Sequence, residues 1–312
     1  MKIKITDTKL IQFESTDGLE LPGLFFEPKN KTHRVAINLH GNGSSSVFYS
    51  FERADGLARH LNEKGIAFFT FNNRGAHYIK KLKINQDGQK EEIKIGTTFE
   101  LIKDCIQDID GAIEFLEKLG YKEFYLIGHS TGANKICVYH FYKPRNNVSK
   151  YVLIGGGDDT GLYHDMVGGT AKFRKYLKQA KSQIEKGNGR KLIPKYIADY
   201  LLSYQSFYDT CNPDGDYNVF PFNEYINKLK LSKKPLFREF KTISKPTLVV
   251  YGEHDEYCYG QVERVVDILK KQAPDKDLFE FRIIRGADHG FDGFEEELSQ
   301  LVADWLSYRH PL

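Results

Sequence analysis

Tyr125-Leu126-Ile127-Gly128-His129-Ser130-Thr131-Gly132-Ala133 is the stretch that decides the fold, because a strand-like apolar run passes through Gly-x-Ser-x-Gly directly into a helical pattern. A chain that leaves a strand and enters a helix within a few residues must hold the central serine in a strained backbone conformation. Gly128 and Gly132 provide the room for this turn. We therefore expect Ser130 at the carboxyl end of a buried strand, with the N–H groups of the next helix directed at a developing oxyanion.

Similar apolar runs, each suited to a buried strand, occur on both sides of this turn. They cover residues 35–39, 66–71, 148–154, 247–251 and 278–284, and helical patterns at 48–64, 99–119, 260–271 and 291–308 alternate with them. Strands that alternate with helices over short connections predict a mostly parallel, doubly wound α/β sheet. Residues 9–13 and 19–26, joined at Thr16-Asp17-Gly18, predict an antiparallel hairpin at its start.

Two segments interrupt this alternation. Residues 80–96 are rich in lysine and carry a turn sequence at their centre, which predicts a protruding charged hairpin. Residues 158–244 contain helical patterns but no strong buried strand. Because a structureless loop of that length is implausible, we interpret it as a helical cap inserted into a core formed by 1–157 and 245–312.

Composition excludes several classes of protein. The 45 basic and 42 acidic residues give a net charge of only +3, too balanced to indicate nucleic-acid binding, and no apolar run is long enough for a membrane span. Met1 to Ile5 alternate like a strand and lack a signal-peptide core. The four cysteines, Cys105, Cys137, Cys211 and Cys258, are widely spaced, which favours reduced thiols in a cytoplasmic protein over disulfides or a zinc site.

A serine hydroxyl is a poor nucleophile, so Ser130 needs a base and the base needs an orienting acid. Asp255 follows one expected buried strand and His289 follows the next. Since the carboxyl ends of parallel strands meet at one sheet edge, the topology predicts that Ser130, Asp255 and His289 come together there. Their order along the chain is the order expected for a serine hydrolase built on such a sheet.

Other residues compete for these roles. Ser130 could simply occupy a strand-to-helix turn, and His40, His129 and His254 are alternative bases, although the first two lie in tight turns and the third adjoins the acid. The alternative acids are Glu253, Glu256, Asp158 and Asp159, the last two because they follow the strand after the serine.

With these motifs in place, the chain resembles the α/β-hydrolase superfamily over nearly its whole length apart from the cap. The resemblance assigns the nucleophile to Ser130, the acid to Asp255 and the base to His289. His40-Gly41-Asn42-Gly43 resembles the family's oxyanion loop, which implies that the backbone N–H groups of Asn42 and Thr131 bind the oxyanion. Arg74-Gly75 corresponds to a frequent Arg-Gly turn, with Asn72 in place of the acid that often precedes it.

The helix near 100–110, the serine turn and the preceding hairpin also resemble the siderophore-ester-hydrolase-like branch of esterases and lipases. The resemblance implies a serine carboxylic-ester hydrolase that needs no metal or organic cofactor. A peptidase, an acyltransferase or a ligand-binding receptor with little turnover remains an alternative. The expected partner is a small-molecule ester, and the sequence does not indicate an oligomeric state.

Two compositional features mark the expected cap. Nine Lys or Arg residues and one acid occur between Lys172 and Lys195, which indicates a solvated helical face or, less often, an attraction for anionic substrates. Tyrosines at 196, 200, 204 and 208 recur every four residues and predict one stripe of a helix. Such a stripe usually packs a helix onto its neighbour, but Tyr204, Phe207 and Tyr208 are the residues we expect to line a substrate pocket.

Overall fold

The structure is a computed structural model that describes residues 7–43 and 45–308. The strand-like pattern of residues 1–5 and Ser44 of the expected oxyanion loop lie outside the described residues.

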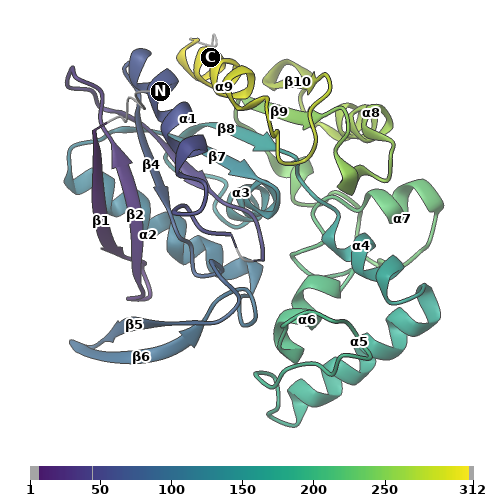
Figure 1. The fold of residues 1–312 in the computed structure, drawn as a ribbon. Coiled ribbons are helices and arrows are strands. Elements are labelled where there is room, and N and C mark those ends of the chain that lie inside the picture. Colours follow the sequence, from purple (N-terminus) through teal and green to yellow (C-terminus); the bar gives the residue numbers. More distant parts are fainter. Residues whose placement is uncertain (1–6, 44, 309–312) are drawn as a thin grey trace.

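The core is an eight-stranded sheet in the order β1-β2-β4-β3-β7-β8-β9-β10 (Figure 1). β1 (Thr8–Glu14) and β2 (Glu20–Phe26) form the antiparallel hairpin, and β2 is antiparallel to β4 (Ala67–Phe71). The pairs from β4 through to β10 are parallel; these strands are β3 (Arg34–Leu39), β7 (Glu123–His129), β8 (Val148–Ile154), β9 (Thr247–Gly252) and β10 (Phe279–Ile284). The mostly parallel α/β sheet expected from the sequence is confirmed.

Helices cover both faces of this sheet, because alternate side chains of each buried strand point to opposite faces. In β7, Tyr125 and Ile127 join the apolar cluster beneath α1 (Phe51–Glu63) and α9 (Glu295–Ser307). Phe124 and Leu126 join the cluster beneath α2 (Cys105–Lys118), α3 (Thr131–Tyr142) and α8 (Val262–Gln272). Burial on both faces explains why these strands are continuous apolar runs in the sequence.

The lysine-rich hairpin consists of β5 (Lys80–Gln86) and β6 (Gln89–Ile95), which form a separate two-stranded sheet projecting from the core (Figure 1). Lys90 pairs with Glu20 of β2, and an isolated bridge joins Leu19 to Ile84. We call this hairpin the ribbon.

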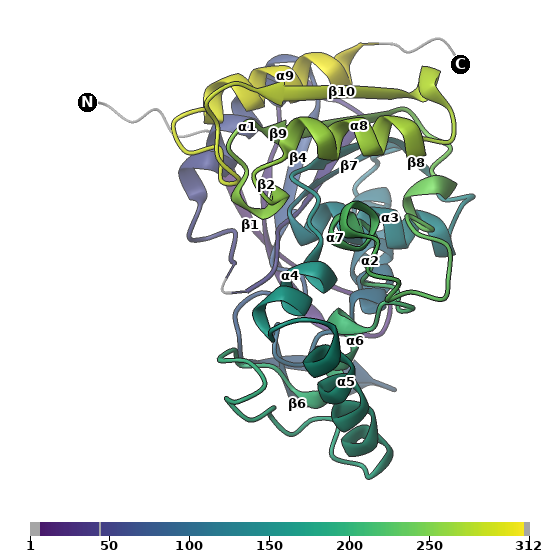
Figure 2. The same cartoon turned by 90° about the vertical axis from the view of Figure 1, so that its right-hand side faces the viewer.

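Residues 158–244 run between β8 and β9, and we call them the insertion. Their helices are α4 (Asp159–Met166), α5 (Thr170–Glu185), α6 (Tyr204–Cys211) and α7 (Phe222–Asn227). The insertion also contains the short 3-10 turn η2 (Phe240–Thr242). The other 3-10 turns lie in the rest of the chain and are η1 (Ile102–Asp104), η3 (Glu256–Cys258) and η4 (Lys276–Leu278). In Figure 2, α4, α5 and α6 lie below the sheet and beside the ribbon.

The tyrosine stripe does not form one helix, which corrects the sequence expectation. Residues 191–203 are turns and extended chain, closed by a bridge between Leu192 and Ser203, and α6 begins only at Tyr204. Pro194 lacks the N–H that a continuous helix would need. Tyr196 and Tyr200 are therefore 65% and 49% exposed, whereas Tyr204 and Tyr208 pack against the insertion's own apolar cluster.

Candidate active site

The turn between β7 and α3 holds Ser130 with φ 55° and ψ −127°, a conformation that non-glycine residues rarely adopt. The flanking glycines are required by close packing. A β-carbon at Gly128 would lie 2.4 Å from the backbone of Gly132, and one at Gly132 would lie 2.1 Å from the carbonyl oxygen of Leu39. The sharp strand-to-helix turn expected from the sequence is therefore present, with Ser130 at its tip.

The loops after β9 and β10 bring Asp255 and His289 together at the same edge. His289 Nδ1 lies 2.9 Å from Asp255 Oδ2, and both side chains are buried. Asp255 Oδ1 also accepts the Tyr257 N–H at 3.0 Å, so both carboxylate oxygens are fixed. Because Asp255 occupies Nδ1, His289 has Nε2 left to exchange a proton on the side of the cavity that it shares with Ser130.

Three of the four alternative acids, Asp158, Glu253 and Glu256, have other partners. Asp158 caps α4, accepting N–H bonds from Gly161 at 2.8 Å and Asn223 at 2.6 Å. Glu253 pairs with Arg285 and accepts the Gly286 N–H at 2.8 Å. Glu256 accepts the backbone N–H of His289 at 3.1 Å, which helps to hold that loop.

Two further residues, His129 and Tyr257, contact His289, and the sequence did not indicate these contacts. His129 Nε2 donates to the His289 carbonyl oxygen at 2.8 Å, and burial beside His289 lowers the pKa of His129 to about 4. His129 is therefore neutral near pH 7 and fixes the His289 loop to the serine turn. The Tyr257 ring stands edge-on to the imidazole of His289, with centroids 4.6 Å apart.

Asn42 and Thr131, the expected oxyanion donors, line the same cavity as Ser130. Tyr217, a buried residue of the insertion, contacts the loop that carries Asn42. Its hydroxyl accepts a hydrogen bond from Asn42 Nδ2 at 2.9 Å and lies close to the Thr131 side chain. The insertion thus helps to hold the Asn42 loop, and nothing local to Tyr217 in the sequence indicated this contact.

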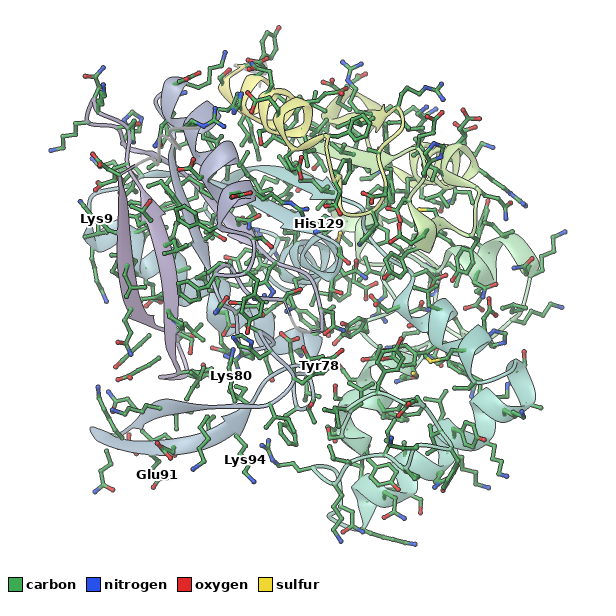
Figure 3. The ribbon with its side chains drawn as sticks, in the orientation of Figure 1. Lys9, Tyr78, Lys80, Glu91, Lys94 and His129 are labelled. Carbon is green, nitrogen blue, oxygen red and sulfur yellow. The ribbon has the colours of Figure 1, made fainter. Side chains whose placement is uncertain are left out.

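The cavity has a volume of about 500 Å³ and lies between the serine turn and the insertion. Its lining residues include Ser130, Thr131 and His289 of the core and Leu162, Tyr163, Tyr200 and Leu202 of the insertion. Tyr78, which lies between the ribbon and the insertion in Figure 3, lines it as well.

The three aromatic residues expected to line the pocket are not among its lining residues, which corrects that expectation. Phe207 is fully buried in the insertion's own apolar cluster, and Tyr204 and Tyr208 pack against the same cluster. A helix buries its apolar stripe against its neighbours, so these side chains of α6 face α5 rather than the cavity.

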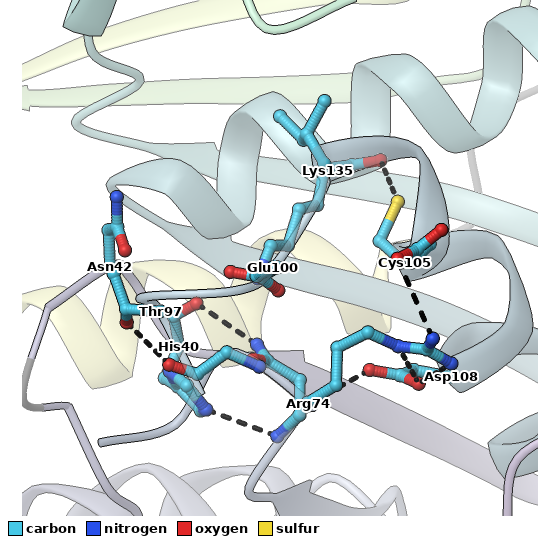
Figure 4. A network of polar contacts seen from close by, with 12 residues as sticks. His40, Asn42, Arg74, Thr97, Glu100, Cys105, Asp108 and Lys135 are labelled. Atoms are coloured by element: carbon cyan, nitrogen blue, oxygen red, sulfur yellow. Dashed lines mark hydrogen bonds and ion pairs between the residues drawn. The ribbon is translucent and has the colours of Figure 1, made fainter. Parts of the chain in front are cut away.

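A buried polar network supports the site from below (Figure 4). Arg74 donates to both oxygens of Asp108 and pairs with Asp17 of the hairpin turn, which raises the pKa of the guanidinium. Lys135 of α3 pairs with Glu100 at 2.5 Å, and both side chains are almost completely inaccessible to solvent. These charges join the Arg-Gly turn, α2 and the helix that carries Ser130.

All four cysteines are free and buried. Among residues 7–43 and 45–308, no cluster of His, Cys, Asp or Glu is arranged to hold a metal ion, and no helix there has the length and apolarity needed to cross a membrane.

Solved structures share this architecture. Est1E from Butyrivibrio proteoclasticus, in a complex with ferulic acid, is 15% identical with a TM-score of 0.62, and the match covers 95% of this chain and 97% of that one. The esterase Pf2001 from Pyrococcus furiosus is 18% identical (TM-score 0.53; 96% and 90% covered), and the carboxylesterase CesB from Bacillus subtilis is 17% identical (0.53; 96% and 92%). No curated protein matches the chain significantly.

The sheet order, the helices on both faces and these structural neighbours define an α/β-hydrolase fold. Residues 96–309 match the family described as "Protein of unknown function (DUF1749)", so more than half of the chain falls within that match. The chain belongs to this family.

Proposed function

We propose that this protein is a serine hydrolase that cleaves carboxylic esters through an acyl-enzyme. Ser130 Oγ attacks the ester carbonyl carbon while His289 Nε2 takes the serine proton, and Asp255 stabilises the resulting imidazolium. The backbone N–H groups of Asn42 and Thr131 stabilise the oxyanion. His289 then gives the proton to the leaving alcohol. In the second half of the reaction His289 takes a proton from water, the water oxygen attacks the acyl carbon, and the proton returns to Ser130 Oγ as the carboxylic acid leaves.

One observation carries the proposal: a serine at positive φ shares a cavity with a histidine whose Nδ1 is bonded to a buried carboxylate. The same groups can serve amide hydrolysis or acyl transfer, so the leaving group must be tested. The structural neighbours named as esterases favour an ester.

The test is labelling with a fluorophosphonate together with turnover of 4-nitrophenyl esters of increasing acyl length. We expect labelling and turnover in the wild type, and in Ser130→Ala loss of labelling and a fall in kcat of at least about 10³-fold. Unchanged turnover in Ser130→Ala would contradict the proposal. Labelling without ester turnover would favour a peptidase, and transfer to an added alcohol or amine would favour an acyltransferase.

A further inference from the structure

Asp159, the first residue of α4, lines the same cavity as Ser130 and His289 but has no part in the proposed proton relay. The contrast with its neighbour Asp158 is direct. Asp158 uses both carboxylate oxygens to bind backbone N–H groups, whereas Asp159 Oδ2 is shielded from solvent and has no hydrogen-bond partner among the described residues. The carboxylate lies next to the cavity wall at Gly157, since a β-carbon at this lining residue would stand 3.9 Å from Oδ2.

An acceptor in this state is costly. A buried polar group that is left unpaired loses its hydration without compensation, and a charged one loses more, so native proteins pair such groups in nearly every case. Where the carboxylate that carries the unpaired oxygen lines a cavity, a donor on the ligand can pair with it, and the site then rejects analogues that lack the donor.

The rest of the cavity wall indicates which donor this is. Among the described lining residues none is Lys or Arg, so the cavity wall itself supplies no permanently charged partner for Asp159. Tyr78, Tyr163, Tyr200 and Tyr257 contribute aromatic rings, with Tyr163 and Tyr200 centroids 5.9 Å apart. A carboxylate among aromatic faces is suited to an ammonium group, which gains both a charge-assisted hydrogen bond and cation–π contacts.

The basic stretch of α5 and the following loop adds no positive charge to the cavity wall. Lys172, Arg174 and Lys175 are exposed and are not among the lining residues, so they offer no attraction for an anion within the cavity.

We propose that the cavity selects esters that carry a protonated primary amine, with the Asp159 carboxylate accepting a hydrogen bond from the ammonium group and the tyrosine rings surrounding it. This inference rests on the proposed ester hydrolysis and names the substrate class of the same site. A neutral ester of equal shape leaves Asp159 unpaired and is the poorer substrate.

Electrostatics are consistent with this selection. Burial raises the pKa of Asp159 to about 7, partly offset by His289 and Lys135. A bound ammonium group stabilises the carboxylate form, so an amine substrate provides the countercharge that the empty wall lacks.

The experiment compares 4-nitrophenyl 6-aminohexanoate with 4-nitrophenyl heptanoate, in which a methyl group replaces the ammonium. At pH 8 we expect kcat/KM to favour the amino ester by about tenfold or more, and Asp159→Asn to lower that ratio by about 10- to 100-fold. The 6-acetamidohexanoate ester, which keeps an N–H donor but has no charge, should behave like the heptanoate.

Asp165→Asn is the matched control, because Asp165 is an exposed acid on the same helix and is not among the lining residues. We expect it to leave the ratio unchanged. Equal kcat/KM values for the two esters in the wild type, or a ratio that Asp159→Asn does not lower, would overturn the inference while leaving ester hydrolysis intact.

A binding measurement separates the two proposals if no ester is turned over. Calorimetry on Ser130→Ala should detect binding of hexylammonium but not of 1-hexanol, and Asp159→Asn introduced into the same protein should abolish the difference. Absence of turnover together with this selective binding would contradict only the hydrolase proposal. Equal binding of the two compounds would overturn the amine selection.

Discussion

Tyr217 joins the insertion to the loop that carries the expected oxyanion donor Asn42. Replacing it with phenylalanine removes the hydroxyl that accepts the Asn42 hydrogen bond but keeps the buried ring. Each lost hydrogen bond is worth about 0.5–1.5 kcal/mol, and a donor misplaced at the oxyanion is felt mainly in the transition state. We expect Tyr217→Phe to lower kcat for 4-nitrophenyl butyrate by about tenfold with little change in KM.

Tyr151→Phe is the control for that prediction. Tyr151 is equally buried, and its hydroxyl bonds to Asn146, which is not among the residues lining the cavity. It should lower the melting temperature but not the rate of fluorophosphonate labelling, whereas Tyr217→Phe should slow labelling. If both variants lose only stability, Tyr217 has no positioning role.

The pH dependence of stability tests the state of Asp159 without any substrate. Because its pKa is about 7 in the folded protein and 3.8 ordinarily, the folded state holds the proton more tightly than the unfolded chain does. Ionisation of Asp159 therefore lowers the free energy of unfolding progressively as the pH rises from about 4 to about 7. A salt-bridged acid behaves in the opposite way, because its contribution is lost as the pH falls. The charges that act on Asp159 are those of His289 and the buried Lys135, which favour its carboxylate form, and that of Asp158, which disfavours it.

We expect the melting temperature of Asp159→Asn to rise relative to that of the wild type as the pH increases from 4 to 7, and the difference to stay constant above that range. Asp209, whose pKa burial also raises to about 7, is present in both proteins and cancels in the difference. Asp158 is coupled to Asp159, so the double variant Asp158→Asn with Asp159→Asn, compared with Asp158→Asn, isolates the Asp159 contribution. A difference independent of pH would mean that Asp159 is not an unpaired acid in the folded state.

At the scale of elements, the Lys135–Glu100 pair ties the helix that carries Ser130 to the segment preceding α2. Removing one partner of such a pair leaves the other charge buried, at a cost of about 3–5 kcal/mol, whereas removing both can be nearly neutral. We therefore expect Lys135→Met to lower the free energy of unfolding strongly, and the double variant Lys135→Met with Glu100→Gln to recover most of it. Denaturant titration of the two single variants and the double variant gives the coupling energy between Lys135 and Glu100. Additive losses of stability would contradict the prediction that the two charges are coupled.

The parts of this fold that follow local rules could be predicted from the sequence. β7 and the turn at Ser130 are encoded by an apolar run and two glycines that the packing demands. The proximity of Asp255 and His289 followed from topology, because parallel strands deliver their following loops to one edge.

Other parts depend on contacts between distant segments and could not be predicted. The tyrosine spacing at 196–208 suggested one helix, but the chain around Pro194 folds back so that Leu192 pairs with Ser203. The loss of one continuous helix moved Tyr200 to the cavity and left Tyr204 and Tyr208 in the insertion's interior. The unpaired oxygen of Asp159 likewise exists only because Asp158, and not Asp159, takes the N–H groups of Gly161 and Asn223.

At the scale of the whole molecule, the insertion consists of two parts that are packed differently. Its first part, up to Cys211, has its own apolar cluster, whereas Tyr217, Phe220 and Phe240 of the second part belong to the main core. Figure 1 shows the helices α5 and α6 of the first part at a distance from the sheet. The cavity is lined on one side by this separately packed part, so residues there can change specificity with little effect on the sheet.

A pair of variants in this first part tests that division. Phe207→Ala removes a fully buried ring from its core and should destabilise it by about 3–5 kcal/mol, lowering the melting temperature and the turnover of all esters together. Tyr200→Ala removes a half-exposed ring from the cavity wall and should alter kcat/KM selectively, with a larger loss for 4-nitrophenyl esters of long or amine-bearing acyl groups than for the acetate. Its melting temperature should stay close to that of the wild type, because the ring is not part of the insertion's buried cluster. If instead Phe207→Ala changes the relative kcat/KM values and Tyr200→Ala lowers the melting temperature, the substrate contacts α6. The cavity lined by Ser130 and Tyr200 is then not where specificity is set.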